Sequence, residues 1–142
     1  MISTDHFHPI LVHFPIALVT LGFVVELISL FIKKEVCLPK IGFYLLIVGT
    51  LFAIITLLSG LFFTREMSGS AGEIKETHEL FAWITVGLLM ITSVLKIILQ
   101  TRKIRNPVLK RISFVLYALA TVSVGTTGFF GGILVYNYMM PL

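Results

Sequence analysis

Two histidines in this chain open the same short pattern, and they are the side chains best suited to bind a ligand. The pattern is His-x3-Ala-x2-Thr-x-Gly, and it occurs at residues 13–22 and 78–87. Each copy opens a long apolar segment, so His13 and His78 are expected at the same depth on two equivalent helices. Because imidazole is the commonest metal ligand among side chains, the pattern predicts a binding site between these helices.

The first chemistry that the pattern favours is haem b binding. Two neutral imidazoles on opposite sides of the haem plane would leave no coordination position for a substrate, which favours electron transfer. Ala17 and Ala82 lie one helical turn beyond the two histidines and leave space beside them. The predicted cofactor-binding residues are His8, His13, Ala17, Arg65, His78, Ala82 and Tyr136, with Arg65 and Tyr136 expected near the propionates.

A non-haem metal ion is the second chemistry that these residue types allow. Copper, zinc or iron is bound by histidine, and the expected ligands are His8, His13 and His78, with His6, Glu76 and Glu79 nearby. His8 and His13 are five residues apart, about 140° around a helix, which is a poor arrangement for one small ion. A third alternative is a structural or assembly subunit of a membrane complex, in which histidines only cap helices and no cofactor is bound.

The composition indicates an integral membrane protein. The chain is 57% hydrophobic and only 13% charged, and its mean hydropathy of +1.02 is far from that of a soluble domain. Apolar stretches cover residues 9–32, 41–63, 80–99 and 112–139, and each reaches the ~20 residues that cross a bilayer as a helix. We therefore expect a single all-α domain over residues 1–142, an integral membrane four-helix bundle, with the first stretch retained as a span.

The basic residues predict how the bundle is oriented. Of the eleven Lys and Arg residues, eight lie between the first and second stretches or between the third and fourth, and a ninth, Lys96, lies near the end of the third stretch. The positive-inside rule then places both connections in the cytoplasm and both termini outside, in a bacterial inner membrane. All four histidines fall at the outer, periplasmic side. The net charge of +4 is explained by topology, so we expect the lipid bilayer and no nucleic acid as a partner.

The same sequence suggests that a helical hairpin is duplicated. Residues 13–32 align with 78–97 at an offset of 65, and residues 40–63 align with 111–134 at an offset of 71. This alignment makes the two pattern histidines symmetry mates about an axis along the membrane normal, and it gives His8 no histidine counterpart. Identical pairs in the second alignment include Thr56/Thr127 and Gly60/Gly131.

Local residue choices give three further expectations. Pro15 cannot donate to the Leu11 carbonyl, so the first helix should bend just beyond His13 and free a carbonyl near the site. Ser70 and Glu73 have the spacing of a capping box, which places the start of the third helix near residue 71. The acid within a span, Glu26, is expected to form an ion pair with Lys96 at similar depth.

The beginning of the chain resembles a bacterial family of predicted four-span membrane proteins, known as domain of unknown function family 2231. The resemblance rests on the run His8, Pro9, Val12, His13, Phe14 and Pro15, on a histidine opening the third span (His78), and on Gly131, Gly132 and Tyr136 in the fourth. Some members of that family are fused to cytochrome c-like domains, which implies redox work near the membrane. We therefore expect a small b-type cytochrome, an electron carrier more than an enzyme, whose partner is a quinol, a periplasmic cytochrome or a larger respiratory complex.

Overall fold

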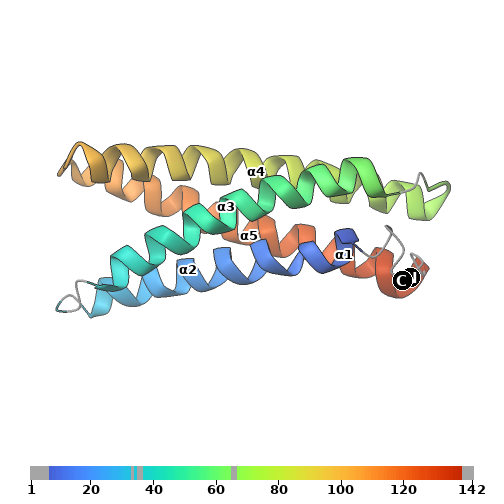
Figure 1. Ribbon diagram of the computed structural model, residues 1–142, viewed down its shortest axis with the longest axis horizontal. Helices are drawn as coiled ribbons and strands as arrows, with labels where there is room; N and C mark the ends of the chain where they lie inside the picture. Colours follow the sequence, from blue (N-terminus) through green and yellow to red (C-terminus); the bar gives the residue numbers. More distant parts are fainter. Residues whose placement is uncertain (1–6, 33, 35–36, 65–66, 139–142) are drawn as a thin grey trace.

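The computed structural model describes residues 7–32, 34, 37–64 and 67–138 of the chain, and the regular structure in this part is entirely helical. Four of the helical segments are long and apolar enough to cross a membrane, which confirms the predicted all-α four-helix bundle (Figure 1). The helices are α1 (Phe7–Leu11), α2 (His13–Phe31), α3 (Cys37–Phe63), α4 (Ser70–Thr101) and α5 (Pro107–Tyr138).

The bundle consists of two helical hairpins. α2 packs along α3, and α4 packs along α5, whereas the hairpins meet less extensively, through α3 against α4 and α2 against α5. Figure 1 shows the α2–α3 and α4–α5 connections at one end of the bundle, and α1 near the other end, where α5 finishes.

The interior of the bundle combines an apolar cluster, which includes Val19, Leu46, Leu89 and Tyr117, with many small polar side chains, while its surface is apolar. Large hydrophobic side chains are exposed along all four long helices, and the buried set includes Thr50, Thr56, Ser59, Thr85, Thr92, Ser93, Ser113 and Ser123. Hydroxyl pairs join neighbouring helices, at 2.8 Å between Thr50 Oγ1 and Ser93 Oγ and at 2.7 Å between Thr85 Oγ1 and Ser123 Oγ. Packing of small residues and interhelical hydrogen bonds of this kind are typical of helices in lipid.

Glycine brings the helices of the first hairpin close together. A Cβ atom added at Gly49 would lie 2.9 Å from Val19 Cγ2, and one added at Gly42 would lie 3.2 Å from the Gly22 carbonyl oxygen. A side chain at either position would therefore force α2 away from α3. Close backbone approach across small residues is a common way for membrane helices to associate.

The two hairpins bury matching positions, with the predicted register between α3 and α5 but a different register between α2 and α4. The buried residues of α2 recur in α4 at an offset of 70, as Pro15/Thr85, Val19/Leu89 and Gly22/Thr92. Buried residues of α3 recur in α5 at an offset of 71, as Gly42/Ser113, Leu46/Tyr117, Gly49/Ala120 and Ala53/Val124. The predicted offset of 65 would pair the buried α2 positions with exposed ones, because residues 80, 84 and 87 are exposed. Duplication of a hairpin itself stays a prediction.

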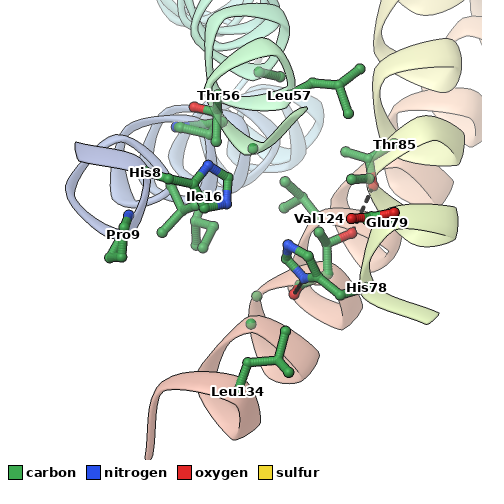
Figure 2. A pocket seen from close by; sticks show the side chains of 18 of the residues that line it. His8, Pro9, Ile16, Thr56, Leu57, His78, Glu79, Thr85, Val124 and Leu134 are labelled. Atoms are coloured by element: carbon green, nitrogen blue, oxygen red, sulfur yellow. Dashed lines mark hydrogen bonds between the residues drawn. The ribbon is translucent and has the colours of Figure 1, made fainter. Parts of the chain in front are cut away.

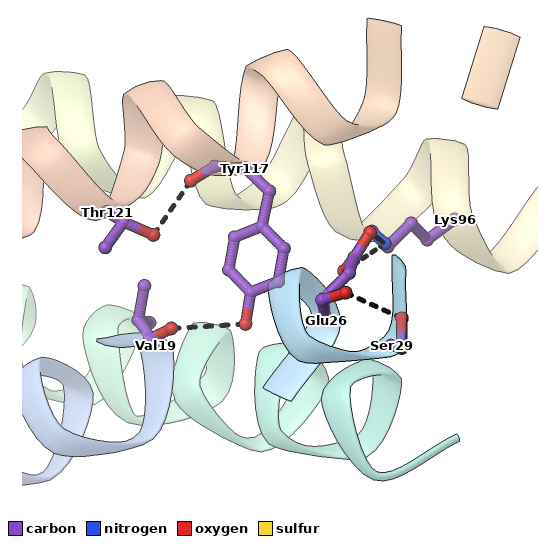
Figure 3. A network of polar contacts seen from close by, with 6 residues as sticks. All are labelled: Val19, Glu26, Ser29, Lys96, Tyr117 and Thr121. Carbon is purple, nitrogen blue, oxygen red and sulfur yellow. Dashed lines mark hydrogen bonds and ion pairs between the residues drawn. The ribbon is translucent and has the colours of Figure 1, made fainter. Parts of the chain in front are cut away.

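The predicted ion pair is present at the end of the bundle opposite α1, which we call the ion-pair end. Lys96 Nζ binds the Glu26 carboxylate, and both side chains are 15% exposed. The same ammonium lies 5.5 Å from the centre of the Tyr117 ring, whose hydroxyl donates to the Val19 carbonyl at 3.2 Å (Figure 3). The Ser29 hydroxyl donates to the Glu26 carbonyl at 2.6 Å. Lys96 and Tyr117 of the second hairpin therefore contact Glu26 and Val19 of the first hairpin at this end.

The start of α4 lies close to its predicted position, but the predicted capping box does not form. Gly69 precedes the helix with a φ of 68°, a left-handed conformation that glycine adopts readily. The N–H of Glu73 donates to the Gly69 carbonyl at 3.2 Å. Ser70 lies inside the helix, and its Oγ accepts a hydrogen bond from the Tyr138 hydroxyl at 3.2 Å. Ser70 therefore ties the end of α5 to the start of α4 instead of capping α4.

Candidate functional site

A cavity of about 390 Å³ lies between the two hairpins at the end that carries α1. We call this part of the molecule the histidine end, because His8 and His78 lie on opposite walls of the cavity (Figure 2). Its lining is mostly apolar, with contributions from all five helices, and includes Pro9, Ala53 and Val124. The sequence predicted a site between the helices, and the structure has a space there that is large enough for a ligand.

The rings of His8 and His78 face each other across this cavity. Their centroids are 6.3 Å apart, and the ring planes are nearly perpendicular, at 85°. Figure 2 shows that each ring turns one nitrogen toward the other ring. The two side chains come from different hairpins, so a ligand bound by both would bridge the hairpins.

A hydroxyl group determines which nitrogen of His8 carries the proton. His8 Nδ1 lies 2.8 Å from Ser59 Oγ, and Ser59 Oγ donates its own hydrogen to the Thr56 carbonyl at 2.7 Å. Because a serine hydroxyl has one hydrogen, Ser59 must accept from His8, so Nδ1 carries the proton. The Nε2 atom of His8 is therefore left with a lone pair.

A carbonyl group has the same effect on His78. The His78 Nδ1 atom lies 2.9 Å from the Thr127 carbonyl oxygen, which can only accept. Nδ1 is therefore the protonated nitrogen in the neutral ring, and Nε2 has a lone pair. The two lone pairs lie on the nitrogens that face the space between the rings, which is an arrangement suited to a Lewis acid.

A glycine lies against each ring. A Cβ atom added at Gly60 in α3 would lie 3.0 Å from His8 Cε1, and one added at Gly131 in α5 would lie 3.1 Å from His78 Cε1. Both distances are shorter than ordinary van der Waals contact, so alanine at either position would push the ring. The absence of a side chain lets each imidazole lie directly on the neighbouring helix backbone.

Comparison with known proteins gives one result. A family model described as "Predicted membrane protein (DUF2231)" matches residues 4–141, nearly the whole chain. The chain belongs to the DUF2231 family. This membership confirms the resemblance indicated by the first histidines and supports a membrane location for this DUF2231 protein. No curated protein and no solved structure matches the chain.

His13 is not the partner of His78 in this DUF2231 protein, although the sequence pattern predicted that pairing. Its side chain is exposed at the rim of the cavity, and its Nδ1 lies 2.8 Å from the Pro9 carbonyl oxygen. Val12, between α1 and α2, keeps helical backbone angles (φ −61°, ψ −25°), and its N–H donates to the His8 carbonyl. Since the helical path continues through Val12, His13 lies about 140° around the axis from His8.

Pro15 of α2 frees the carbonyl that the sequence predicted, close to His13. α1 ends at Leu11 and α2 begins at His13, so the two helices are divided at Val12, before His13 and not beyond it, although the backbone of Val12 keeps helical angles. Pro15 leaves the Leu11 carbonyl without its usual helical donor, and this carbonyl accepts a hydrogen bond from Thr56 Oγ1 at 3.2 Å. The freed carbonyl therefore links the α1–α2 junction to α3 beside His8.

The remaining predicted site residues have different positions. Ala82 and Tyr136 line the cavity, whereas Ala17 is exposed and is not part of its lining. Arg65 and His6 lie outside the described residues. Within the described ranges, no group of three or more His, Cys, Asp or Glu side chains is arranged to bind a metal ion. The two facing imidazoles are thus the strongest candidate ligands.

The sequence contained a signal for the correct pairing that the repeated pattern obscured. At an offset of 70, His8 aligns with His78 and Glu26 aligns with Lys96. Both pairs are in contact across the two hairpins, at opposite ends of the bundle. Sequence reasoning missed the contribution of Ser59, because a hydroxyl acting on one histidine nitrogen depends on a contact between α1 and α3.

Proposed function

We propose that this DUF2231 protein is a small membrane-bound b-type cytochrome whose haem is held between His8 and His78. The separation of the two rings is the observation that carries this proposal. Metal–imidazole nitrogen bonds are about 2.0 Å and a ring nitrogen lies about 1.1 Å from the ring centre, so imidazoles on opposite sides of one metal ion have centres about 6.2 Å apart. The observed separation of 6.3 Å agrees with this arrangement.

The hydrogen bonds and the cavity support the same ligand. Ligating histidines usually donate their other N–H to a protein acceptor, which fixes the tautomer and ring orientation, and the contacts of Ser59 and Thr127 provide this for both rings. Small residues on the facing helices, among them Ala82 and Gly128, line an apolar space. A haem bound there would supply one-electron redox chemistry.

The proposed role is electron transfer and not catalysis on a substrate. Two protein ligands would complete the coordination of a haem iron, so no position would remain for a reacting molecule. The histidine end lies at one end of the bundle, near the membrane surface that the positive-inside rule assigns to the periplasm. A quinol, a periplasmic cytochrome or a larger respiratory complex at that surface is therefore the proposed partner.

A bare metal ion is the weaker alternative. Structural zinc sites use four protein ligands and catalytic sites use three, whereas the described residues bring two imidazoles together at this position. Haem needs only two ligands from the protein, because the porphyrin supplies the others. The ligand count therefore favours haem over a single ion.

The decisive experiment is a visible spectrum of the detergent-purified protein, oxidised and then reduced with dithionite. A sharp Soret band and split α and β bands on reduction are expected for a six-coordinate b haem. His8→Ala and His78→Ala should each abolish this spectrum, whereas His13→Ala, the matched control at the cavity rim, should keep it. A spectrum that depends on His13 and not on His8 would contradict the proposed ligand pair. A protein made with ample haem that has no Soret band would overturn the function.

A further inference from the structure

The connection between α4 and α5, at the ion-pair end, carries a dense group of positive charges. Five exposed basic side chains lie within ten residues of the chain, and we call them the basic corner: Arg102, Lys103, Arg105, Lys110 and Arg111. The sequence has no Asp or Glu after Glu79. Within the described ranges, none of the five side chains forms an ion pair. The basic corner therefore has positive charge that the described residues do not neutralise.

Backbone hydrogen bonds hold this connection in a defined conformation. The N–H of Lys103 donates to the Gln100 carbonyl at 3.4 Å, and the N–H of Ile104 donates to the Leu99 carbonyl at 3.1 Å. These two bonds form the Schellman motif that ends many helices. The side chain of Asn106 then caps α5 by accepting hydrogen bonds from two backbone N–H groups, at 2.9 and 3.3 Å. The cations of the corner thus project from an ordered turn.

Lysine is an unusual residue at the position that Lys103 occupies in this motif. Its φ is 51°, and no other described residue except glycine has a positive φ. Glycine is the usual residue here, because a Cβ atom is strained in the left-handed conformation. A strained residue of this kind supports the hypothesis of a function for its side chain. The only polar group of the Lys103 side chain is its ammonium.

Apolar side chains that face the membrane lead directly to the basic corner. Exposed apolar residues form a row on the outer face of each helix, and the rows are Ile91, Val94 and Ile98 on α4, and Val108, Ile112 and Val115 on α5. Arg102 follows Ile98 by four residues, so it continues the row on α4. A bound molecule can lay an apolar chain along these rows while its anionic group reaches the cations.

We propose that the basic corner binds the phosphate of an anionic phospholipid. The cations attract the phosphate, and the apolar rows contact the acyl chains, which a free phosphate ion lacks. The corner joins two candidate membrane spans, so it lies at the depth of the headgroups, where basic residues attract anionic lipids. This depth and the adjoining apolar rows favour a lipid over an acidic protein. The inference does not depend on the proposed haem.

The test measures lipid binding to the detergent-purified full chain by native mass spectrometry. Phosphatidylglycerol is compared with phosphatidylcholine of the same acyl chains, whose headgroup has no net charge. The wild-type protein should bind phosphatidylglycerol about tenfold or more tightly, because each Lys or Arg near an anionic lipid contributes about fivefold. Inorganic phosphate at the same concentration should not displace the lipid, because it cannot use the apolar rows.

One substitution separates binding from folding. Lys103→Gly relieves the left-handed strain, so it should raise the unfolding midpoint in detergent while it lowers the preference for phosphatidylglycerol about fivefold. Lys103→Arg should keep the preference, and Arg102→Gln combined with Arg105→Gln should remove most of it. Lys40→Gln is the matched control, since Lys40 is an exposed cation of α3 at the same end of the bundle, and it should leave the preference unchanged.

Four results would overturn the proposal. The first is a wild-type protein that binds both lipids equally, and the second is a Lys103→Gly protein that is folded and keeps the full preference. The third is a loss in Lys40→Gln as large as in Lys103→Gly, which would assign the effect to the general charge of this end. The fourth is displacement of the lipid by inorganic phosphate or by a co-purifying acidic protein. Loss in Lys103→Gly, with retention in Lys103→Arg and Lys40→Gln, would support the lipid site.

Discussion

Each end of the bundle has a contact between residues at the same separation in the sequence, but the two contacts leave their polar groups in different states. At each end, a residue of the first hairpin contacts the residue 70 positions later in the second, His8 with His78 and Glu26 with Lys96. At the ion-pair end, the charges neutralise each other and Tyr117 packs beside them (Figure 3). At the histidine end, both groups present lone pairs to a cavity (Figure 2).

The difference between the two ends is whether the polar groups satisfy one another within the protein. The groups at the ion-pair end find their partners within the protein, so nothing further is needed there. Each histidine has a hydrogen-bond partner for Nδ1, whereas its other nitrogen, which carries a lone pair, faces the other ring across the cavity (Figure 2). Two acceptors that face each other gain nothing from their contact, and only a third group between them can satisfy both.

The largest expected effect is on stability at the ion-pair end. Glu26→Ala should destabilise the fold by about 3 kcal/mol, because it leaves Lys96 buried without its carboxylate. The exchanged pair Glu26→Lys with Lys96→Glu should recover most of this loss. Unfolding in mixed detergent, followed by circular dichroism, measures both variants. A single variant as stable as the wild type would show that this end does not hold the hairpins together.

A smaller loss of stability is expected when the glycines beside the histidines are replaced by alanine. Gly60→Ala and Gly131→Ala should each destabilise the protein by about 1–2 kcal/mol, because the new methyl group overpacks against an imidazole. Both variants should also alter the Soret band of the proposed haem complex. Gly87→Ala is the matched control, since a Cβ atom there meets nothing within 4 Å, and it should leave the spectrum unchanged. Unequal effects of the two variants would argue against equivalent environments for the two rings.

The smallest effect concerns the hydroxyl groups midway along the bundle. Thr50→Val removes the hydrogen bond to Ser93 and should cost about 0.6 kcal/mol, the average for such bonds in membrane helices. Thr121 occupies the equivalent position in α5, and its hydroxyl donates to the Tyr117 carbonyl in its own helix. Thr121→Val should therefore lower the free energy of unfolding by less than Thr50→Val does. If both variants lose the same stability in this unfolding measurement, the Thr50–Ser93 hydrogen bond does not stabilise the contact between the hairpins.

Much of the fold followed from the sequence, because its signals are properties of single segments. Apolar length predicts each span, and Glu26 and Lys96 are charged residues at similar depth in otherwise apolar helices. The pairing at the site was harder to predict, because it depends on helix phase. His13 shares its surrounding pattern with His78, but five residues of continuous helix turn it away from the side that His8 occupies.

The Glu26–Lys96 pair also affects which hairpins can pack together in a membrane. A bundle made from two copies of the first hairpin would bring two Glu26 carboxylates together, and two copies of the second would bring two Lys96 ammoniums together. Like charges at this depth repel with little water to screen them. The electrostatic contribution of this pair therefore favours association of the first hairpin with the second over association of two identical hairpins.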